Sequence, residues 1–403
     1  MRKAIKIKDL GEVITGNTPP RSNPELYGRH TPFIKATDIE ESSKFTYFPE
    51  EFYSEIGFQK YKKSLIRKGA SCVVTIGSVG QKMTMAHCDC FINQAMNAVV
   101  PNNNYDDEYV YYLLKNNIHK LKMLNSGTAS GRENISKSAF SNMEIEAILD
   151  KDKQIIIGKI LSAYDKLIEN NQKQIKLLEE AAQRLYKEWF VDLRFPGYEK
   201  TPIIDGVPEG WKKYRISEIG KVVTGKTPST EKEEYYGKEI PFVKIPDMYN
   251  GIYSIVTETS LTKEGADTQK SKYIPANSIM VSCIATVGLV NISVNVCQTN
   301  QQINTIILNQ QEDLYYIYFT MKRLKTLLEG VGSNGATMTN VNKTKFENLE
   351  ILYPIKELRK KYFCFCYPIF KKIYDLSMNN IFLSQARDFL LPKLMSGELE
   401  VQL

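Results

Sequence analysis

Residues 11–38 read GEVITGNTPPRSNPELYGRHTPFIKATD, and residues 220–247 repeat them as GKVVTGKTPSTEKEEYYGKEIPFVKIPD, at a constant offset of 209 and without a gap. The matched positions of the first copy include Gly11, Val13, Thr15, Gly16, Thr18, Pro19, Tyr27, Gly28, Pro32, Phe33, Lys35 and Asp38. A repeat of about half the chain is too long for a solenoid, whose units span roughly 20–50 residues. The sequence therefore contains two copies of one whole domain.

The duplication continues beyond this opening block. NQAMN at 93–97 matches NQQIN at 300–304, and NISKSAFSNMEI at 134–145 matches NVNKTKFENLEI at 340–351. Apolar, β-branched runs bounded by Gly, Pro and Asn predict strands, and segments that begin with acidic residues predict amphipathic helices. The predicted strands include Val73–Ile76, Ala98–Val100, Ile279–Ser282 and Thr305–Leu308, and the predicted helices span 106–124 and 312–330. Each copy is expected to be a mixed α/β domain.

The segment after the first copy has the pattern of a long helix. Its apolar positions recur in alternating steps of four and three residues, which is the heptad seam of a helix that packs against another helix. The expected seam positions are Ile157, Leu161, Tyr164, Ile168, Asn171, Ile175, Leu178, Ala182, Leu185 and Trp189. Asn171 is the polar exception, and a single polar seam residue usually fixes register at a cost in stability. So narrow a stripe requires a partner helix.

The segment after the second copy is expected to supply that partner. Its expected seam positions are Phe363, Tyr367, Phe370, Tyr374, Ser377 and Ile381. In this register Ser377 corresponds to Asn171, and Pro368 is expected to kink or break the helix near its start. Beyond residue 381 the apolar face is expected to shift onto Phe382, Ala386 and Phe389. The alternative is that both segments are merely core helices of their own domains.

These patterns divide the chain into five parts. We expect a first domain over 1–150, a spacer helix over 151–195, a linker over 196–211, a second domain over 212–355 and a second spacer helix over 356–403. The boundary stretch FPGYEKTPIIDGVPEGW at 195–211 holds three prolines and three glycines. Such a composition is typical of turns and linkers, so Gly197, Gly206 and Gly210 are expected to form turns.

Composition and charge narrow the class of protein. With 42% hydrophobic and 25% charged residues the chain is expected to be soluble and globular, and no apolar run reaches the roughly 18 residues of a membrane span. The first residues lack the apolar stretch of a secretory signal, and seven cysteines do not make a disulfide scaffold, so we expect a reduced, cytoplasmic setting. The net charge of +7 permits a DNA partner without requiring one, because residues 1–150 carry 19 basic and 17 acidic side chains.

Recognisable catalytic motifs are missing from the sequence. The three histidines do not form an HExxH zinc site, and there is neither a Walker A sequence nor a G-x-S-x-G elbow. GVGSNG at 330–335 matches the dinucleotide fingerprint only literally, because no βαβ unit surrounds it. HCDC at 87–90 and CFC at 364–366 space their cysteines more closely than zinc sites normally do. We therefore expect a non-catalytic chain without a metal site, whose cysteines have packing roles.

A duplicated α/β domain, with each copy followed by a long seam-bearing helix, resembles the specificity subunit of type I restriction-modification systems. The TG-x-TP…YG…PF-x-K…D blocks and the NI-x-K-x-x-F and NV-x-K-x-x-F loops are similar to its target-recognition domains. EEAAQRLYKEWFVDLRFPG and the ending LLPKLMSGELEVQL are similar to the ends of its two spacer helices. The resemblance covers essentially the whole chain. It implies an α+β fold in which two similar target-recognition domains are joined by two long antiparallel coiled-coil helices in a pseudo-two-fold arrangement.

The resemblance also implies partners. Each domain would read one half of a bipartite target in double-stranded DNA, and two methyltransferase (M) subunits and restriction (R) subunits would assemble with the chain for host defence. S-adenosylmethionine, ATP and Mg²⁺ would be held by those partners, and this chain would bind no cofactor. Half-sites about one helical turn apart, roughly 34–36 Å, lie on the same face of the duplex. A pair of rigid helices could therefore place both readers at once.

Polar residues in loops beside the repeated motifs are the candidates for DNA contact, because base edges and phosphates are bound by such side chains. The candidates in the first copy are Lys35, Thr37, Lys82, Arg132, Asn134 and Lys137, and those in the second are Lys244, Thr339, Asn340 and Lys343. Residues that the copies share are expected to hold the fold or to touch phosphates, because the two half-sites usually differ. Base readers are expected instead in the unmatched stretches 40–68 and 249–275. Thr15–Gly16 and Thr224–Gly225 are interpreted as turn chemistry.

Two other functions compete with DNA recognition. An enzyme that fuses reading with methylation would require a cofactor-binding fold and an N/D-P-P-aromatic motif, which TPPR at 18–21 does not supply. A non-catalytic coiled-coil scaffold that binds proteins would show no salt-dependent binding to DNA, whereas phosphate contacts produce a steep salt dependence.

Overall fold

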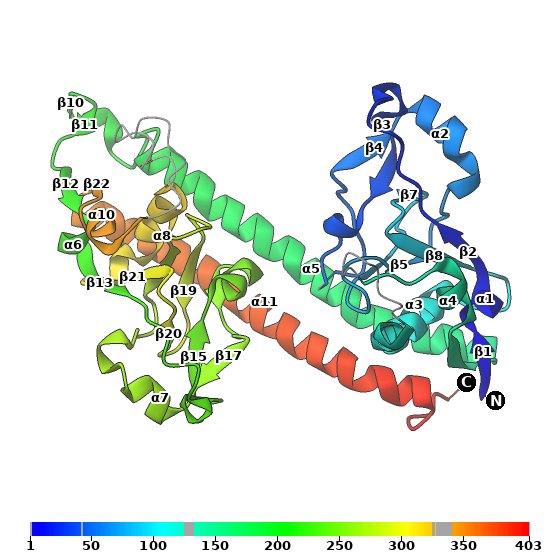
Figure 1. Ribbon diagram of the computed structural model, residues 1–403. Helices are drawn as coiled ribbons and strands as arrows, with labels where there is room; N and C mark the ends of the chain where they lie inside the picture. The colour runs from blue at the N-terminus through cyan, green and yellow to red at the C-terminus, as the bar shows by residue number, and fades with distance from the viewer. Residues whose placement is uncertain (1, 42, 125–132, 325–326, 328–340, 403) are drawn as a thin grey trace. The chain divides into compact units, whose positions relative to one another are not determined.

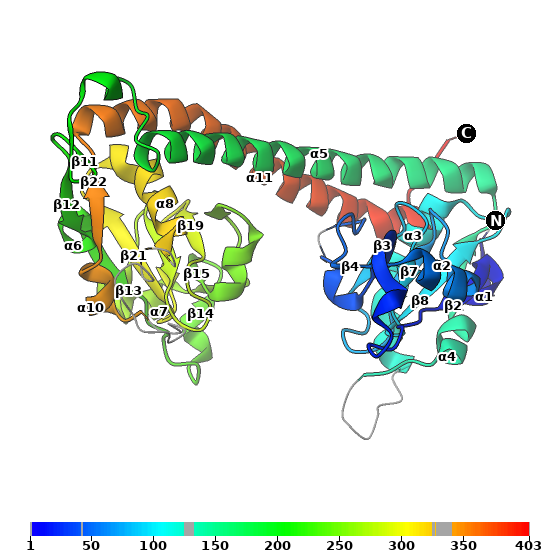
Figure 2. The ribbon, with the colours of Figure 1, turned by 90° about the horizontal axis from the view of Figure 1, so that it is seen from above.

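The structure is a computed structural model, and it describes residues 2–41, 43–124, 133–324, 327 and 341–402. Its contacts divide the chain into two compact units, of which unit 1 comprises Met1–Gln172 with Asn379–Leu403 and unit 2 comprises Lys173–Met378. Two long helices, α5 (Lys151–Phe190) and α11 (Lys356–Ser396), are unbroken in both views (Figure 1, Figure 2). Each unit therefore holds one copy of the repeat and a part of both long helices.

Unit 1 is built around two small sheets. The strands of the first sheet, in spatial order, are β2 (Gly11–Thr15), β8 (Met96–Pro101), β5 (Ser71–Val74) and β6 (Met83–Met85). Those of the second are β4 (Glu51–Tyr53), β3 (Tyr27–Ile34) and β7 (Phe91–Ile92), and β1 (Arg2–Lys6) pairs separately with β9 (Glu144–Ile148). The first sheet is antiparallel throughout, whereas β3 is antiparallel to β4 and parallel to β7.

Unit 2 repeats this strand order. Its first sheet is β13 (Gly220–Thr224), β21 (Ile303–Leu308), β18 (Ile279–Ser282), β19 (Val290–Ser293) and β16 (Tyr253–Ser254). Its second sheet is β14 (Tyr236–Gly237), β17 (Thr259–Leu261), β15 (Ile240–Val243) and β20 (Gln298–Thr299), and β12 (Lys212–Arg215) pairs with β22 (Glu350–Tyr353). The expected α+β class with two similar mixed domains is confirmed.

Central strands read as continuous apolar runs because they lie between two layers. All four residues of β5 are buried. Val73 packs into a core with helix residues, whereas Cys72 and Val74 pack into a second core with Ile34 and Ile92 from the other sheet. The predicted strands at 73–76, 98–100, 279–282 and 305–308 correspond to β5, β8, β18 and β21. Burial on both faces explains why they lack the alternation of a half-exposed strand.

The predicted helices at 106–124 and 312–330 begin within two residues of where expected; the first is shorter than expected as an α-helix, and residues 325–326 and 328–330 of the second lie outside the described residues. In unit 1, α3 (Asp107–Asn117) is capped by Asp106, whose side chain accepts a hydrogen bond from the Tyr109 amide, and a 3₁₀ segment continues from Ile118 to Leu124. In unit 2, α8 spans Leu314–Lys322. Both helices bury aromatic side chains against the long helices, as α3 does with Ile157 and Leu161 of α5. Residues of the long helices therefore form part of the hydrophobic core of each unit, in addition to the contacts between the two helices.

Within unit 1 the two long helices run antiparallel. Asp165 of α5 pairs with Arg387 of α11, and six residues later Asn171 of α5 pairs with Asn380, seven residues earlier along α11. The expected α5 seam positions are all buried or half-buried, from Ile157 and Leu161 in unit 1 to Trp189 in unit 2. Toward the C-terminal end of α5, however, Tyr186 and Phe190 are buried, whereas the expected Leu185 and Trp189 are half-buried.

The expectations for α11 need correction. Between residues 356 and 378 its buried apolar positions are Leu358, Tyr362, Cys366, Phe370, Ile373 and Leu376, so the predicted seam is largely one residue out of register there. Phe370 is buried, but Tyr367 is 52% exposed, and the later apolar face predicted at Phe382 and Phe389 is also exposed. Phe363, Tyr374, Ser377 and Ile381 are half-buried.

Pro368 does not break α11, which continues through it from Lys356 to Ser396. A proline removes one backbone donor and leaves the carbonyl four residues earlier, that of Cys364, without its helical partner. Both Pro368 and Cys364 lie on the exposed side of the helix. Water can satisfy that carbonyl, which explains why the helix tolerates the proline.

The linker is built from turns. Gly197, Gly206 and Gly210 have φ values of 95°, 78° and 82°, the left-handed region that favours glycine, as predicted. Gly206 lies in a hairpin between β10 (Ile203–Ile204) and β11 (Val207–Pro208). Among the described residues, no helix is long and apolar enough to cross a bilayer.

Candidate nucleic-acid interface

The repeated motifs bond to each other in the same way in both units. In unit 1, Thr15 Oγ1 donates to Asn97 Oδ1 at 2.6 Å, and Thr18 donates to Gln94. In unit 2, Thr224 Oγ1 donates to Asn304 Oδ1 at 2.6 Å, and Thr227 Oγ1 donates to Gln301 Oε1 at 2.7 Å. The TG-x-TP and NQ-x-x-N motifs are thus two sides of one structural contact.

The glycine of this motif is required by close packing. A Cβ atom on Gly16 would lie 2.1 Å from the Asn93 carbonyl oxygen, and one on Gly225 would lie 2.1 Å from the Asn300 carbonyl oxygen. Neither glycine has a positive φ, so the constraint is space and not a left-handed backbone. These contacts give Thr15–Gly16 and Thr224–Gly225 a structural role through close packing between distant segments and not through the turn chemistry that was expected.

The remaining shared residues also hold loops in place. The backbone amide of Lys35 donates to Asp38 Oδ2 at 2.8 Å, and that of Lys244 donates to Asp247 Oδ2 at the same distance. A tyrosine hydroxyl closes the preceding loop in each copy, since Tyr27 donates to the Pro19 carbonyl. The residues that match between the copies therefore form a common scaffold.

The predicted DNA-contact residues are dispersed over this scaffold. Thr37 and Lys137 are exposed, and Lys343 pairs with Glu347 at 3.3 Å. Lys82 and Asn134 come together near the end of β5: the Lys82 carbonyl accepts from the Val74 amide, and Asn134 bridges to Ile76. Arg132, Thr339 and Asn340 lie outside the described residues, as does the GVGSNG segment.

Lys35 and Lys244 occupy equivalent positions with different partners. Lys35 Nζ lies 2.5 Å from Glu50 and 2.9 Å from Glu51, and these hydrogen bonds, with that to Glu50 the largest, raise the pKa of Lys35. Lys244 Nζ instead donates to Thr259 Oγ1 at 2.6 Å. The ammonium group of Lys35 is thus engaged by carboxylates, which weakens its case as a phosphate contact.

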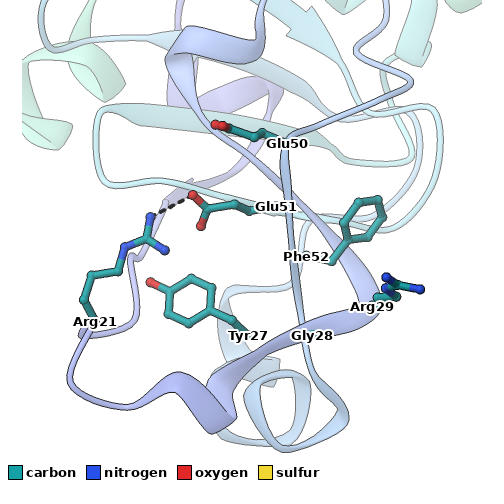
Figure 3. A pocket seen from close by; sticks show the side chains of 7 residues that line it. All are labelled: Arg21, Tyr27, Gly28, Arg29, Glu50, Glu51 and Phe52. Carbon is teal, nitrogen blue, oxygen red and sulfur yellow. Dashed lines mark hydrogen bonds and ion pairs between the residues drawn. The ribbon is translucent and has the colours of Figure 1, made fainter. Parts of the chain in front are cut away.

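An open cavity of about 490 Å³ in unit 1 brings together residues that the motif search missed. Its lining residues are Arg21, Tyr27, Gly28, Arg29, Glu50, Glu51 and Phe52 (Figure 3). Arg21 precedes the 3₁₀ turn at Pro24–Leu26, Tyr27 begins β3, and Glu51 begins β4. Figure 3 shows Arg21, Tyr27 and Glu51 pointing toward one another. Arg21 lies inside the repeated block at a position where the copies differ, and that difference is the sequence signal that could have found it.

Hydrogen bonds and charge organise this cavity. Arg21 Nη2 lies 2.7 Å from Glu51 Oε1, and the Arg21 guanidinium sits 4.6 Å from the centre of the Tyr27 ring. The hydrogen bond from Arg21 is the largest of the effects that lower the pKa of Glu51, so this carboxylate stays charged. Glu51 Oε2 is buried and has no hydrogen-bond partner among the described residues. The cavity therefore offers the guanidinium donors of the exposed Arg21, held in place by the Glu51 carboxylate.

Metal and thiol chemistry have little support. Within the part of the chain that the structure describes, no group of three or more His, Cys, Asp or Glu side chains could hold a metal ion. All seven cysteines are free thiols, and Cys364 is exposed whereas Cys366 is buried. Cys90 and Cys366 therefore pack inside their units, whereas Cys364 faces solvent.

Comparison with known proteins agrees with the geometry. A family model described as the type I restriction modification DNA specificity domain matches residues 3–180 and again 208–371. The chain is 31% identical over 355 residues to the HindI specificity subunit of Haemophilus influenzae, covering 72% of this chain and 77% of that one. It is 27% identical over 410 residues to the MjaIX specificity subunit of Methanocaldococcus jannaschii, covering 98% and 93%.

A solved structure supports the fold. The type I restriction-modification S subunit from M. genitalium superposes with a TM-score of 0.59 at 15% sequence identity, covering 98% of this chain and 96% of that one. Two matches to one domain family, two units with the same strand order and the shared scaffold contacts lead to a single conclusion. The chain belongs to the family of type I restriction-modification specificity subunits and is a DNA specificity subunit with two target-recognition domains.

Proposed function

We propose that each unit reads one half of a bipartite DNA target and that the chain carries out no reaction itself. The observation that carries this proposal is the contrast within the repeat. The two units share scaffold contacts such as Thr15–Asn97 and Thr224–Asn304 but differ in side chains around the same backbone, as at Glu51 and Thr259. Two readers with one frame and different surfaces fit two half-sites of different sequence.

The chemistry then belongs to partner subunits. We propose that two methyltransferase subunits and restriction subunits assemble with this chain in the cytoplasm, and that they hold S-adenosylmethionine, ATP and Mg²⁺. Linking two readers in one chain makes the second binding event intramolecular, which raises avidity without new contacts. One specificity chain can thus direct both modification and cleavage to the same split sequence.

Modification mapping tests the proposal. The chain would be co-expressed with its methyltransferase partner, and methylated adenines would be located by sequencing genomic DNA. We expect one split motif, and exchanging residues 1–150 for the equivalent domain of a relative should change one half of that motif only. Methylation at unrelated sites, or none with a competent partner, would overturn the proposal. A preparation without this chain is the control.

A binding experiment separates this function from a protein-binding scaffold. The assembled complex should bind duplex DNA with an affinity that falls steeply as salt rises, because released counterions accompany each phosphate contact. If the complex does not bind DNA, or if its affinity for DNA does not change between about 50 and 200 mM salt, the protein-binding scaffold is favoured.

A further inference from the structure

The cavity beside β3 and β4 of unit 1 points to a residue that discriminates bases in one half-site. We propose that Arg21 reads a guanine of the half-site bound by unit 1 and that Glu51 holds Arg21 in position to do so. This inference rests on the proposed function. It follows from the structural equivalence of the two units, the exposure of Arg21 and the charges around it.

The strand registers show that Glu51 and Thr259 are structural equivalents. In unit 1, Phe33 of β3 faces Glu51 of β4, and in unit 2, Phe242 of β15 faces Thr259 of β17. Phe33 and Phe242 are matched residues of the repeat. The equivalent lysines contact these equivalent positions, since Lys35 pairs with Glu51 as Lys244 does with Thr259.

The neighbouring positions diverge in the same manner. The next step of the register sets Phe52 of unit 1 against Ser260 of unit 2, and the repeat offset sets Arg21 against Thr230. One backbone frame thus carries an Arg–Glu pair and an aromatic ring in unit 1, and three small hydroxyl residues in unit 2. Half-sites of different sequence require such a difference at the reading surface, whereas phosphate contacts do not.

Arg21 is both available to a ligand and held in place. The Arg21 side chain is 67% exposed and is fixed from one side by Glu51, which itself is 19% exposed. A guanidinium has five N–H donors, so the bond to Glu51 leaves donors free for the O6 and N7 acceptors of guanine. Glu51 Oε2 is buried, and Glu51 Oε1 also lies 2.9 Å from Lys35 Nζ, so this carboxylate positions Arg21 and does not itself contact a base.

A basic segment next to the cavity can hold the DNA backbone. Lys60, Lys62 and Lys63 are exposed on α2 (Glu55–Tyr61) and the 3₁₀ turn Lys62–Ser64. This segment is anchored to β3, because His30 Nε2 lies 2.6 Å from Glu55 Oε2. Lysines position a duplex through its phosphates without reading its sequence. The cavity and the lysines together supply the two kinds of contact that a half-site needs.

Four variants in the methyltransferase complex test the assignment. Arg21→Thr and Glu51→Thr install the unit 2 residues, Arg21→Lys keeps the charge and loses the planar fork, and Arg67→Thr is the matched control. Arg67 is an exposed arginine of the same unit that pairs with Asp107 at 2.8 Å and does not line the cavity. Methylation would be measured on duplexes carrying the wild-type motif and on duplexes with single base changes in it.

We expect Arg21→Thr and Arg21→Lys to lower discrimination at one base pair of the unit 1 half-site by roughly 5- to 150-fold, with the other half-site unchanged. Glu51→Thr should relax the same base pair, because it removes the carboxylate that positions Arg21, and Arg67→Thr should leave the preference as in wild type. Rescue by lysine, or a uniform loss of methylation on every duplex, would overturn the assignment in favour of a phosphate contact or a structural role. Thermal denaturation of each variant checks that unit 1 remains folded. If the wild-type complex shows no split motif, the proposed function itself fails, which is a different result.

Discussion

Asn171 of α5 donates a side-chain hydrogen bond to Asn380 of α11 at 2.9 Å. The polar seam residue of α5 therefore meets a polar partner on the antiparallel helix. The expected counterpart, Ser377, instead donates to the Ile373 carbonyl within α11. Amide pairs of this kind fix the register of two helices.

A double-mutant cycle on the asparagines should reveal this pair. We expect Asn171→Ala and Asn380→Ala to be coupled by about 0.5–1.5 kcal/mol, the usual contribution of one hydrogen bond. Replacing both with leucine should raise the free energy of unfolding, because an apolar seam is more stable than a polar one. Urea denaturation measures both effects. Strictly additive alanine effects would contradict the pairing.

The buried ion pair between Asp165 and Arg387 should be worth more to stability than any exposed pair on the helices. Both side chains are 8% exposed, and Tyr112 also donates to Asp165. Arg387→Met leaves the buried Asp165 carboxylate without this cation and should cost about 3–5 kcal/mol, whereas Asp165→Asn leaves Arg387 its pair with Asp388 at 2.8 Å and should cost less.

Two further variants sharpen that prediction. Asp165→Leu combined with Arg387→Leu removes both charges and should restore much of the stability. Asp375→Asn disrupts an exposed pair with Lys371 and should change the free energy of unfolding by less than about 0.5 kcal/mol. Equal effects of Arg387→Met and Asp375→Asn would show that the pair is not buried.

Two tyrosines of α11 test its corrected register. Tyr362 is fully buried and its hydroxyl donates to the Ala182 carbonyl at 2.9 Å, whereas Tyr367 is 52% exposed. Tyr362→Ala should cost about 3–5 kcal/mol, as for other buried aromatic residues, and Tyr367→Ala should change stability by at most about 0.5 kcal/mol. Chemical denaturation measures both. The reverse order would restore the register expected from the heptad pattern.

The difference between the two helices shows what sequence can and cannot predict. The expected seam positions of α5 are all buried or half-buried, although near its C-terminal end the core covers Tyr186 and Phe190 more fully than the expected Leu185 and Trp189. In α11 aromatic and apolar residues lie on several faces, so two heptad registers one residue apart fit its sequence almost equally well. Packing against the domain core decides between them, because it buries Tyr362 more fully than Phe363. Asp165 and Arg387 could not be predicted as buried, because charged residues normally indicate solvent.

The candidate site was predicted less completely than the fold. The shared motifs marked the scaffold correctly, because the same contacts must form in both copies. Arg21 and Glu51 are 30 residues apart in sequence, and only the loop before β3 and the pairing of β3 with β4 bring them together. Neither stretch of sequence alone predicts that these two side chains meet. Stretch 40–68, where base readers were expected, does contain Glu51 and Phe52 of the cavity.

Gly16→Ala and Gly225→Ala should each disturb one unit. The added methyl group would overlap a carbonyl oxygen of the NQ-x-x-N turn at 2.1 Å in either unit, which should cost at least about 1–3 kcal/mol. Hydrogen exchange should rise in residues 93–97 for Gly16→Ala and in residues 300–304 for Gly225→Ala. Thr227→Ala, which removes one exposed hydrogen bond, is the milder control. Unchanged exchange in both variants would show that the turn has room to move.

Thiol labelling should identify Cys364 as the fast-reacting cysteine. It is exposed, whereas burial raises the pKa of Cys72, Cys297 and Cys366 to about 12, so these thiols remain protonated and covered at pH 8. The thiolate is the reactive species, and a raised pKa delays its formation until the pH approaches that value. We expect one fast equivalent with Ellman's reagent in the native protein, and its loss in Cys364→Ser.

The helix geometry of α11 explains why Cys364 and Cys366 should behave differently. The two cysteines are two residues apart on a helix with 3.6 residues per turn, so their side chains point to nearly opposite faces. A metal shared by the pair would protect both thiols, so Zn²⁺ should leave the labelling rate of Cys364 unchanged. Slower labelling with Zn²⁺ would revive the ligand interpretation of CFC. Rapid reaction of Cys366 as well would instead mean that the buried register of α11, from Tyr362 through Cys366 to Phe370, is wrong.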